Sequence, residues 1–228
     1  MRLPEPLHAY ARDLSRRFRE GGVRGVFAFL VTGLRAQLSK HDTQLVTVKR
    51  LDEIVVPLRR GEVRIEPVER RHLAALRELN RERGDRAGDA RFAVDLDAGY
   101  GGFVGFKGAQ LVSCYWWADA STPPHRDMRE LGLGIELGAG DVYGYDLYVH
   151  KSHRAGGTVN DFLFQVETAL QERGFERVWG YVASDNRTAR WTYDARGYEP
   201  RWKVERTRVL RHWSNRIVPI EALGRGAA

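Results

Sequence analysis

The sequence predicts an α/β protein in which strands and helices alternate along the chain. Three observations lead to this expectation. The stretch from Asp141 to Tyr198 follows the order strand, glycine turn, helix, strand, helix. Strand-like patterns precede it at Glu62–Val68 and Tyr100–Trp117. Apolar residues make up 43% of the 228 residues, which is enough to fill a buried core.

The first half of the Asp141 to Tyr198 stretch joins a strand to an amphipathic helix. Asp141 to Val149 is rich in β-branched and aromatic residues, and Arg154 to Thr158 is a turn with two glycines. Apolar residues then recur at three- and four-residue spacing until Gly174, as in a helix with one buried face. They are Val159, Phe162, Leu163, Val166, Ala169 and Leu170.

The turn before this helix suits an anionic ligand. The first turn of a helix leaves backbone N–H groups unpaired and carries a partial positive charge. Gly156 and Gly157 have no side chain that would keep a ligand from those groups, and Arg154 adds a full positive charge. We therefore expect this turn to hold a phosphorylated carrier.

The second half of the stretch predicts a short strand followed by a short helix. Arg177 to Ala183 has the strand pattern, and Ser184 to Asn186 supplies helix-capping side chains. Asn186, Ala189 and Tyr193 lie at positions i, i+3 and i+7, so they share one helix face. Gly197 ends this helix.

These residues together carry a resemblance to a known family. Arg154-x-x-Gly157, followed by Asn-x-x-Ala-x-x-x-Tyr-x-x-x-Gly-Tyr from Asn186 to Tyr198, resembles the GCN5-related N-acetyltransferases (GNAT superfamily). The resemblance covers roughly Glu62 to Trp213. It implies an α/β (α+β) fold with one mixed, mostly antiparallel sheet and helices on both faces.

The resemblance also implies a site for acetyl-CoA as cosubstrate. The glycine turn would bind the pyrophosphate and pantetheine, and the main chain of a strand would pair with the pantetheine arm. Asn186 would lie near that arm. Tyr193 would protonate the departing sulfur. The turn residues are Arg154, Ala155, Gly156, Gly157, Thr158 and Val159, and the strand residues are Leu147, Tyr148 and Val149. Val159 stands where the family has a small residue.

The sequence allows two interpretations of Asp146, one as the general base and one as a structural residue. Its place on the strand beside the thioester makes it a candidate base, directly or through a water. Similar sequences often carry a glutamate one residue earlier, where this chain has Tyr145. The second interpretation is that Asp146 only braces the strand.

The expected reaction is acetyl transfer from acetyl-CoA to a primary amine of a small-molecule acceptor, by direct attack in a ternary complex. An enzyme using longer-chain acyl-CoA or an acyl carrier protein is the alternative, supported by Val159 and the basic chain. A non-catalytic module that senses acyl-CoA or binds nucleic acid is a second alternative. The net charge of +7 comes from 37 basic and 30 acidic residues, a mixture more typical of ordinary surface charge than of nucleic-acid binding.

Cysteine and histidine content limits the other kinds of site. With Cys114 as the single cysteine, the sequence has no disulfide framework, and a cytoplasmic protein is the default expectation. Cys114 lies in an alternating pattern that predicts a buried strand thiol. His150 and His153 have no evident third ligand near them, so we expect no metal site.

The expected domains are a basic helical N-terminal extension (1–60), a GNAT domain (61–214) and a C-terminal tail (215–228). Residues 23–39 form an amphipathic pattern. It is expected to pack on the transferase domain or on a second copy in a homodimer; contact with an anionic membrane surface is the less favoured alternative. No apolar run approaches the roughly 20 residues that span a bilayer.

Two further expectations concern the first half of the GNAT domain. Alternation over Tyr100–Trp117 puts one of Trp116 and Trp117 inside the core and the other outside. The glycine-rich stretch from Ser121 to Gly140 is read as an irregular connector, with a mobile loop as the alternative.

Overall fold

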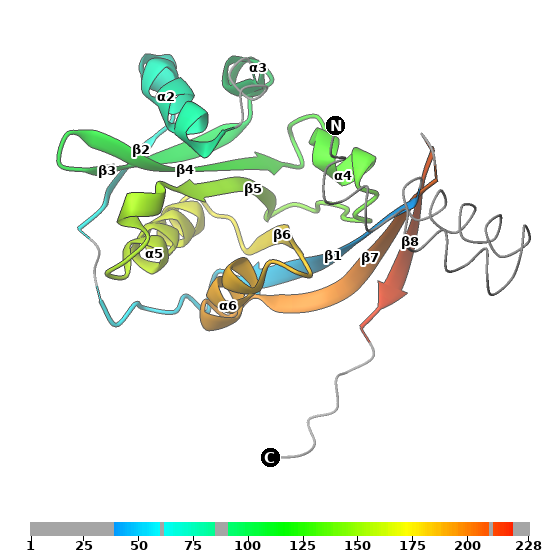
Figure 1. Ribbon diagram of the computed structural model, residues 1–228. Helices are drawn as coiled ribbons and strands as arrows, with labels where there is room; N and C mark the ends of the chain where they lie inside the picture. The colour runs from blue at the N-terminus through cyan, green and yellow to red at the C-terminus, as the bar shows by residue number, and fades with distance from the viewer. Residues whose placement is uncertain (1–38, 60–61, 85–90, 210–211, 221–228) are drawn as a thin grey trace, which may run out of the picture. The chain divides into compact units, whose positions relative to one another are not determined.

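The computed structural model describes residues 39–59, 62–84, 91–209 and 212–220 (Figure 1). The chain divides into two compact units. The larger unit, Thr43–Val204 with Arg216–Ala228, contains every feature of the candidate site described below.

Strands and helices alternate along the chain, as the sequence predicts. The elements are β1 (Ser39–Arg50), β2 (Arg64–Pro67), a 3-10 turn η1 (Arg70–His72), α2 (Leu73–Arg83), α3 (Arg91–Asp97), β3 (Gly101–Lys107), β4 (Gln110–Asp119), α4 (Arg126–Glu130), β5 (Asp141–Val149), η3 (Lys151–His153), α5 (Thr158–Glu172), β6 (Arg177–Ala183), α6 (Arg187–Ala195), β7 (Glu199–Val209) and β8 (His212–Pro219).

The strands form one mixed sheet in the order β2-β3-β4-β5-β6-β1-β7-β8. The pairs β2–β3, β3–β4, β4–β5 and β1–β6 are antiparallel, and β5–β6 is parallel. The mixed, mostly antiparallel sheet is therefore as expected. One strand has an unexpected origin: residues Gln44 to Arg50, from the part of the chain assigned to the extension, pair with β6 inside the sheet.

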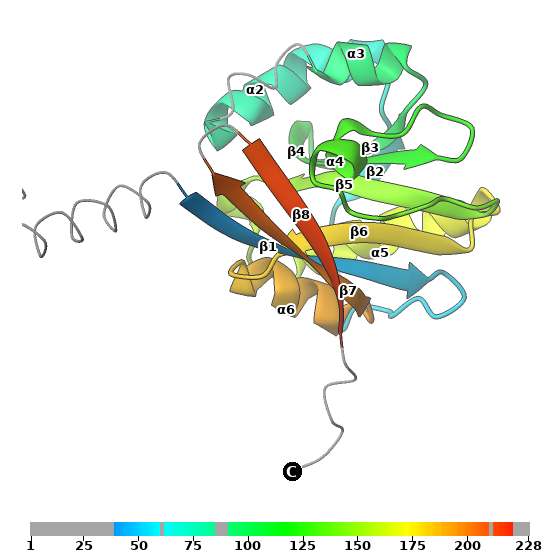
Figure 2. The same ribbon diagram turned by 90° about the vertical axis from the view of Figure 1, so that its right-hand side faces the viewer.

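Helices cover both faces of the sheet (Figures 1 and 2). Helices α2, α3 and α4 lie on one face and α5 and α6 on the other. Each face has its own apolar core, and neighbouring strand residues divide between the two: Trp116 belongs to the first and Trp117 to the second. The expectation that only one of these indoles is buried is wrong, because both faces are covered and the side chains are 0% and 8% exposed.

The predicted helices after the glycine turn are confirmed. Helix α5 runs from Thr158 to Glu172, and Asn186 is the N-cap of α6. Cys114 is confirmed as a buried strand thiol, 2% exposed, and burial raises the pKa of its thiol.

The stretch from Ser121 to Gly140 differs from the expected connector. It contains the short helix α4, and Leu133 and Ile135 after that helix are buried in the core of the α2–α4 face. The glycines follow α4 rather than interrupt it. This segment therefore covers part of the sheet instead of only joining two strands.

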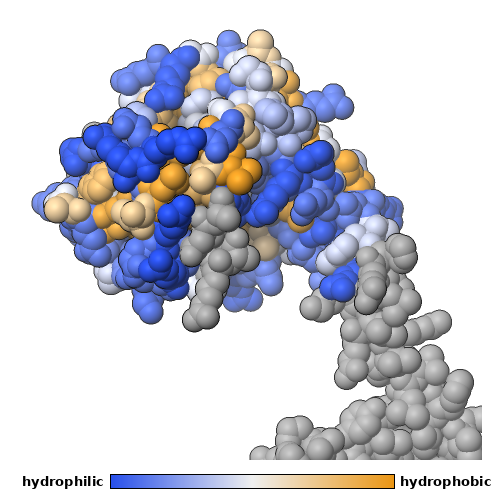
Figure 3. All heavy atoms as spheres, turned by 90° about the horizontal axis from the view of Figure 1, so that it is seen from above, coloured by the Kyte–Doolittle hydropathy of each residue, from blue (hydrophilic) through white to orange (hydrophobic). Residues whose placement is uncertain are grey.

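Several expectations fall outside the described residues. The amphipathic pattern at 23–39 is among them, except that Ser39 begins β1, and so is the end of the tail. Seen from above (Figure 3), the described surface is mostly hydrophilic with small apolar areas. No described helix is both long and apolar enough to cross a bilayer.

Candidate active site

The candidate site lies where β5 and β6 part. These strands pair in parallel only at Asp141–Arg177, Val142–Val178 and Tyr143–Trp179, although β5 continues to Val149 and β6 to Ala183. Beyond Tyr143 the strand edges that face each other are not joined by the described ladder. We call this gap the strand opening. An unpaired edge can take up an extended amide chain as an added strand, and the predicted residues Leu147, Tyr148 and Val149 lie along it.

Glycines line the two sides of the strand opening. A Cβ atom added to Gly180 would lie 3.5 Å from the carbonyl oxygen of Gly144 and 4.0 Å from Oγ1 of Thr47. A Cβ atom added to Gly144 would lie 1.7 Å from the hydroxyl of Tyr115, so only glycine fits there. The walls of the opening are therefore mainly backbone, which leaves room for a ligand with a narrow chain.

Buried polar atoms without a partner surround the strand opening. They are the hydroxyls of Tyr143 and Thr47 and the indole Nε1 of Trp179, none of which has a hydrogen-bond partner among the described residues. Tyr143 and Trp179 are the last paired residues before the strands part. Since buried polar groups are nearly always paired in folded proteins, these atoms mark a place for a ligand or ordered water.

The glycine turn reaches the N-terminus of α5 in the conformation that the sequence predicts. Gly157 is the N-cap residue with φ 86°, and Gly156 has φ 70°, both left-handed. The predicted residues Ala155, Thr158 and Val159 complete the turn, and the hydroxyl of Thr158 donates to the carbonyl of Ala155 at 3.0 Å. A Cβ atom on Gly156 would have no described atom within 4 Å. A Cβ atom on Gly157 would lie 3.0 Å from the carbonyl oxygen of Arg59. Among the described residues the free space before this 15-residue helix is therefore at Gly156, where an anion would fit.

Arg154 is held at the side of this turn. Its Nε donates to the carbonyl of Val149 at 2.9 Å, and its guanidinium lies 5.5 Å from the centre of the Tyr148 ring. The guanidinium of Arg83 lies 5.3 Å from the same ring. These contacts fix one cation between the end of β5 and the N-terminus of α5.

A groove of about 410 Å³ adjoins the glycine turn. Gly157 and Asn160 of α5, Trp191 of α6 and the segment Val55–Arg59 line it. The apolar side chains at its rim are exposed, including Leu58 and Trp191. The sequence placed Val55–Arg59 in the expected N-terminal extension and not at the site; the available signal was its run of apolar residues in a basic region.

Tyr193 lies on the α5–α6 face, where it packs against the core of that face. It is half-buried, its ring meets that of Tyr198 edge to face at 4.6 Å, and burial raises its pKa to about 12. The phenol is therefore protonated at neutral pH and can donate. Tyr193 also acts electrostatically on the pKa values of Tyr143 and Tyr181, which belong to the core of the opposite face.

Asn186 serves a structural purpose in the described chain. Its side-chain oxygen accepts from the backbone N–H of Ala189 at 3.1 Å, which caps α6. The cap fixes the start of the helix that carries Tyr193.

Asp146 is enclosed by two arginines. Its carboxylate is paired with Arg83 and with Arg91, and the side chain is 5% exposed. Asp146 has the left-handed φ of 51°, which aspartate tolerates better than most residues, and it lies near the register shift between Cys114 and Trp116 of β4. This geometry favours bracing over proton acceptance.

A second acidic group, which sequence reasoning did not select, lies on α4. Asp127 accepts from the hydroxyl of Tyr181 at 3.4 Å and is 26% exposed; burial raises the pKa of its carboxyl. Its backbone N–H donates to Nδ1 of His125 at 3.3 Å. The stretch was read as a connector, and only Pro-Pro-His followed by an acid hinted at a helix start.

His125 anchors this group in an aromatic cluster. Its ring stacks on Tyr145 with centroids 3.8 Å apart, and the Tyr145 hydroxyl donates to Asp95 at 3.3 Å. Burial lowers the pKa of His125 to about 4, so the imidazole is neutral at pH 7. With Nδ1 accepting, the ring proton resides on Nε2.

The described residues offer no group of three or more metal-binding side chains. His150, one of the two histidines considered above, accepts at Nδ1 from the backbone N–H of Ser152 at 3.3 Å. Its Nε2 pairs with Glu82.

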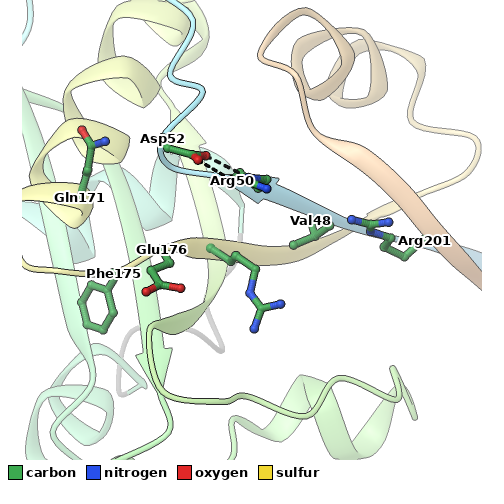
Figure 4. Close-up of a pocket in the computed structure, with 8 residues that line it drawn as sticks. Val48, Arg50, Asp52, Gln171, Phe175, Glu176 and Arg201 are labelled. Atoms are coloured by element: carbon green, nitrogen blue, oxygen red, sulfur yellow. Dashed lines mark hydrogen bonds and ion pairs between the residues drawn. The ribbon is translucent and has the colours of Figure 1, made fainter.

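A further cavity among the described residues lies elsewhere and has different properties. It measures about 700 Å³ and is lined at the end of β1 and the start of β6 by charged residues (Figure 4). Its arginines already have carboxylate partners: Arg50 pairs with Asp52, Arg177 with Asp141 at 2.6 Å and Arg201 with Glu199 at 3.4 Å. Its three arginines are therefore already paired and are not free to bind an anion.

Comparisons with known proteins identify the fold. No protein-family model matches the sequence, and no curated protein matches it. Three solved structures each cover 80% of this chain: a conserved protein of unknown function from Staphylococcus epidermidis (11% identity, TM-score 0.57), the GCN5-related glucosamine N-acetyltransferase region of a fungal multi-domain β-N-acetylglucosaminidase (11%, 0.56) and a GCN5-related N-acetyltransferase from Sphaerobacter thermophilus (14%, 0.54).

These matches span 67%, 22% and 56% of the three relatives' own chains. At such identities the likeness shows the fold alone. The GNAT fold implied by the sequence motifs is therefore confirmed.

Proposed function

We propose that the chain, which has the fold of the GCN5-related N-acetyltransferases, transfers an acetyl group from acetyl-CoA to a primary amine of a small-molecule acceptor. The observation that carries this proposal is the strand opening with an anion-binding turn beside it. A long, flexible thioester with a pyrophosphate needs both features: helix amides for the phosphates and a gap in the sheet for the arm.

The residues present fit such a substrate. The amides of Gly156 to Val159 and the guanidinium of Arg154 would hold the pyrophosphate. The free edge of β5 from Leu147 to Val149 would bind the amides of the pantetheine arm. The unpartnered hydroxyl of Thr47 lies within reach of the same opening.

In this proposal the chain contributes positioning and two proton transfers. The amine must reach the thioester carbonyl as a neutral nucleophile, so it gives up a proton first. Its nitrogen then forms the new C–N bond while the C–S bond breaks, and Tyr193 supplies the proton that the departing sulfur takes up. Asp146, bound by two arginines, would brace β5 beside the reaction.

An acyl carrier protein as donor is the second candidate, and one observation favours it. The groove beside the glycine turn has an exposed apolar rim that includes Val56, Leu58 and Trp191, with Arg59 and Arg154 close by. Such a rim suits the surface of an acidic carrier protein around its phosphopantetheine.

Two measurements test the proposal. Isothermal titration with acetyl-CoA should give a saturable heat, and thiol release from acetyl-CoA should depend on an added primary amine from a panel. The same thiol-release assay with long-chain acyl-CoA and with acetylated acyl carrier protein shows which of the three acyl donors the protein uses. Binding without amine-dependent thiol release would support a sensor of acyl-CoA. Salt-sensitive DNA binding without acetyl-CoA binding would replace the proposal with a nucleic-acid module.

A further inference from the structure

The α2–α4 face has an acidic group positioned for an amine. Asp127 projects from α4, and the Tyr181 hydroxyl on β6 donates to its carboxylate at 3.4 Å. Tyr181 lies two residues beyond Trp179, the last residue of β6 that pairs with β5. The carboxylate is thus tied to the part of β6 that borders the strand opening.

Aromatic side chains pack on the face of the sheet that carries α4, among them Trp179, Tyr181 and Trp202. Trp179 and Trp202 pack with centroids 5.6 Å apart, and Trp202 is fixed by a hydrogen bond of 2.7 Å from its Nε1 to the carbonyl of Leu133. Trp179 and Tyr181 are partly exposed. Aromatic faces attract organic cations, so they form a suitable surface for the carbon chain of an ammonium compound.

Unpartnered donors lie on the same side. The Tyr143 hydroxyl and Trp179 Nε1 are buried without a partner among the described residues. Tyr143 and Trp179 are the last pair of the β5–β6 ladder, and Tyr181, which donates to Asp127, follows Trp179 by two residues. A polar ligand there would complete their hydrogen bonding.

We propose that Asp127 is the residue that receives the ammonium group of the acceptor and takes the proton it must lose, with Tyr181 as its positioning residue. The inference rests on the proposed acetyl transfer. It assigns the acceptor to a class: amines that are cationic at neutral pH, with an aliphatic chain that lies on Trp179 and Tyr181.

The proton balance is complete. The ammonium gives one proton to the Asp127 carboxylate, its nitrogen attacks the thioester carbon, and the C–S bond breaks. Tyr193 protonates the sulfur, and the second proton of the nitrogen restores the Tyr193 phenol. Asp127 then returns its proton to solvent.

The groups around Asp127 come from several elements. Arg126 is its neighbour on α4, Arg91 reaches it from α3, Asp146 from β5 and Tyr181 from β6. Both arginines lower the carboxyl pKa, whereas burial and Asp146 raise it. Asp146 has two arginines on its carboxylate and is 5% exposed. Asp127 has the Tyr181 phenol, the Arg126 Nε at 3.7 Å and an exposure of 26%, so Asp127 is the acid with access to a substrate.

The test compares Asp127→Asn with Asp127→Glu and with the control Glu130→Gln, which removes an exposed acid from the same helix. The probes are ethylamine and 2,2,2-trifluoroethylamine, which share a two-carbon skeleton and of which only the first is cationic at pH 7. With ethylamine, kcat/KM of Asp127→Asn should fall about a hundredfold or more and rise with pH. With trifluoroethylamine, kcat/KM of Asp127→Asn should fall far less. With ethylamine, kcat/KM of Asp127→Glu should lie between those of Asp127→Asn and the wild type. Glu130→Gln should match the wild type.

An unchanged kcat/KM and pH profile in Asp127→Asn would overturn the assignment, and so would equal losses with both amines. Thermal shifts by ethylamine provide a readout without turnover. One outcome separates the two proposals: the wild type releases no thiol, but ethylamine raises its melting temperature and leaves that of Asp127→Asn unchanged. The proposed acetyl transfer would then be wrong and the proposed ammonium site would be supported. If ethylamine stabilises neither protein and no thiol is released, both fail.

Discussion

Two carboxylates on opposite faces of the sheet have opposite surroundings. Glu167 on α5 is 1% exposed, and its Oε2 receives Lys49 of β1 at 3.0 Å as well as Arg196 at the end of α6. Asp127 on α4 is 26% exposed, accepts from one phenol and has the exposed Arg126 guanidinium at 3.7 Å. Glu167 thus has two buried cations and no path to solvent, while Asp127 has a phenol, one exposed cation and a carboxylate that solvent partly reaches.

The difference separates a structural acid from the one that we propose to be reactive. Glu167 joins three elements that are far apart in the sequence, and burial lowers the pKa of Lys49 despite the nearby carboxylate. Removing either kind of group should therefore have different consequences: loss of folding free energy on the α5–α6 face, and loss of catalysis with altered pH dependence on the α2–α4 face.

The largest expected effect is on stability, from Glu167→Gln. The substitution leaves Lys49 and Arg196 buried without their anion, which typically costs about 3–5 kcal/mol. Urea unfolding measures the loss. Glu172→Gln, an exposed site on the same helix, should change stability by less than about 0.5 kcal/mol. If the two variants lose the same free energy of unfolding, Glu167 has no special structural role.

The next effect concerns pH and the α2–α4 face. The folded pKa of His125 is lowered to about 4 from 6.5. Between these values the unfolded state binds a proton that the folded state does not, so stability should fall as pH drops from 6.5 to 4, by up to roughly 3 kcal/mol.

The measurement is urea unfolding at pH 7, 6, 5 and 4 for the wild type and His125→Asn, which keeps an acceptor for the Asp127 amide. The variant should lose less stability over this range. Asp95 and Asp127, whose carboxyl pKa values burial raises, act in the opposite direction in both proteins, so only the difference between the curves is diagnostic. If the free energies of unfolding of the two proteins change in parallel from pH 7 to 4, folding does not lower the pKa of His125.

A smaller effect tests the anion-binding turn. Arg154→Glu replaces the cation beside the N-terminus of α5 with an anion, so acetyl-CoA should bind about 10- to 100-fold more weakly. Isothermal titration gives the dissociation constant. Lys203→Glu on β7 makes the same charge change at an exposed position and should leave binding unchanged. If both variants weaken binding equally, net charge and not the turn attracts the ligand.

The smallest effect isolates one phenol. Tyr193→Phe should lower turnover about tenfold or more, equivalent to ~1.4 kcal/mol, with acetyl-CoA binding nearly intact. Tyr198→Phe removes the phenol of the adjoining ring and serves as the matched control. Turnover that is unchanged in Tyr193→Phe would remove this residue from the mechanism.

The sequence alone determined the elements whose signals are local. Helical periodicity, the positive-φ glycines at 156 and 157 and the Asn186 cap are properties of short segments, so the turn, α5 and α6 were predictable. The expected strand–helix order, and with it the GNAT fold, followed from motifs within about sixty residues. Each of these features depends on neighbours along the chain.

Tertiary structure decided the features that join distant segments. Burial of both Trp116 and Trp117 depends on helices covering two faces, and the partners of Asp146 come from α2 and α3. Asp127 became a candidate only through its hydrogen bond from Tyr181, 54 residues away in the sequence. Periodicity carries no information about such pairings, because folding brings the residues together only after the local elements have packed.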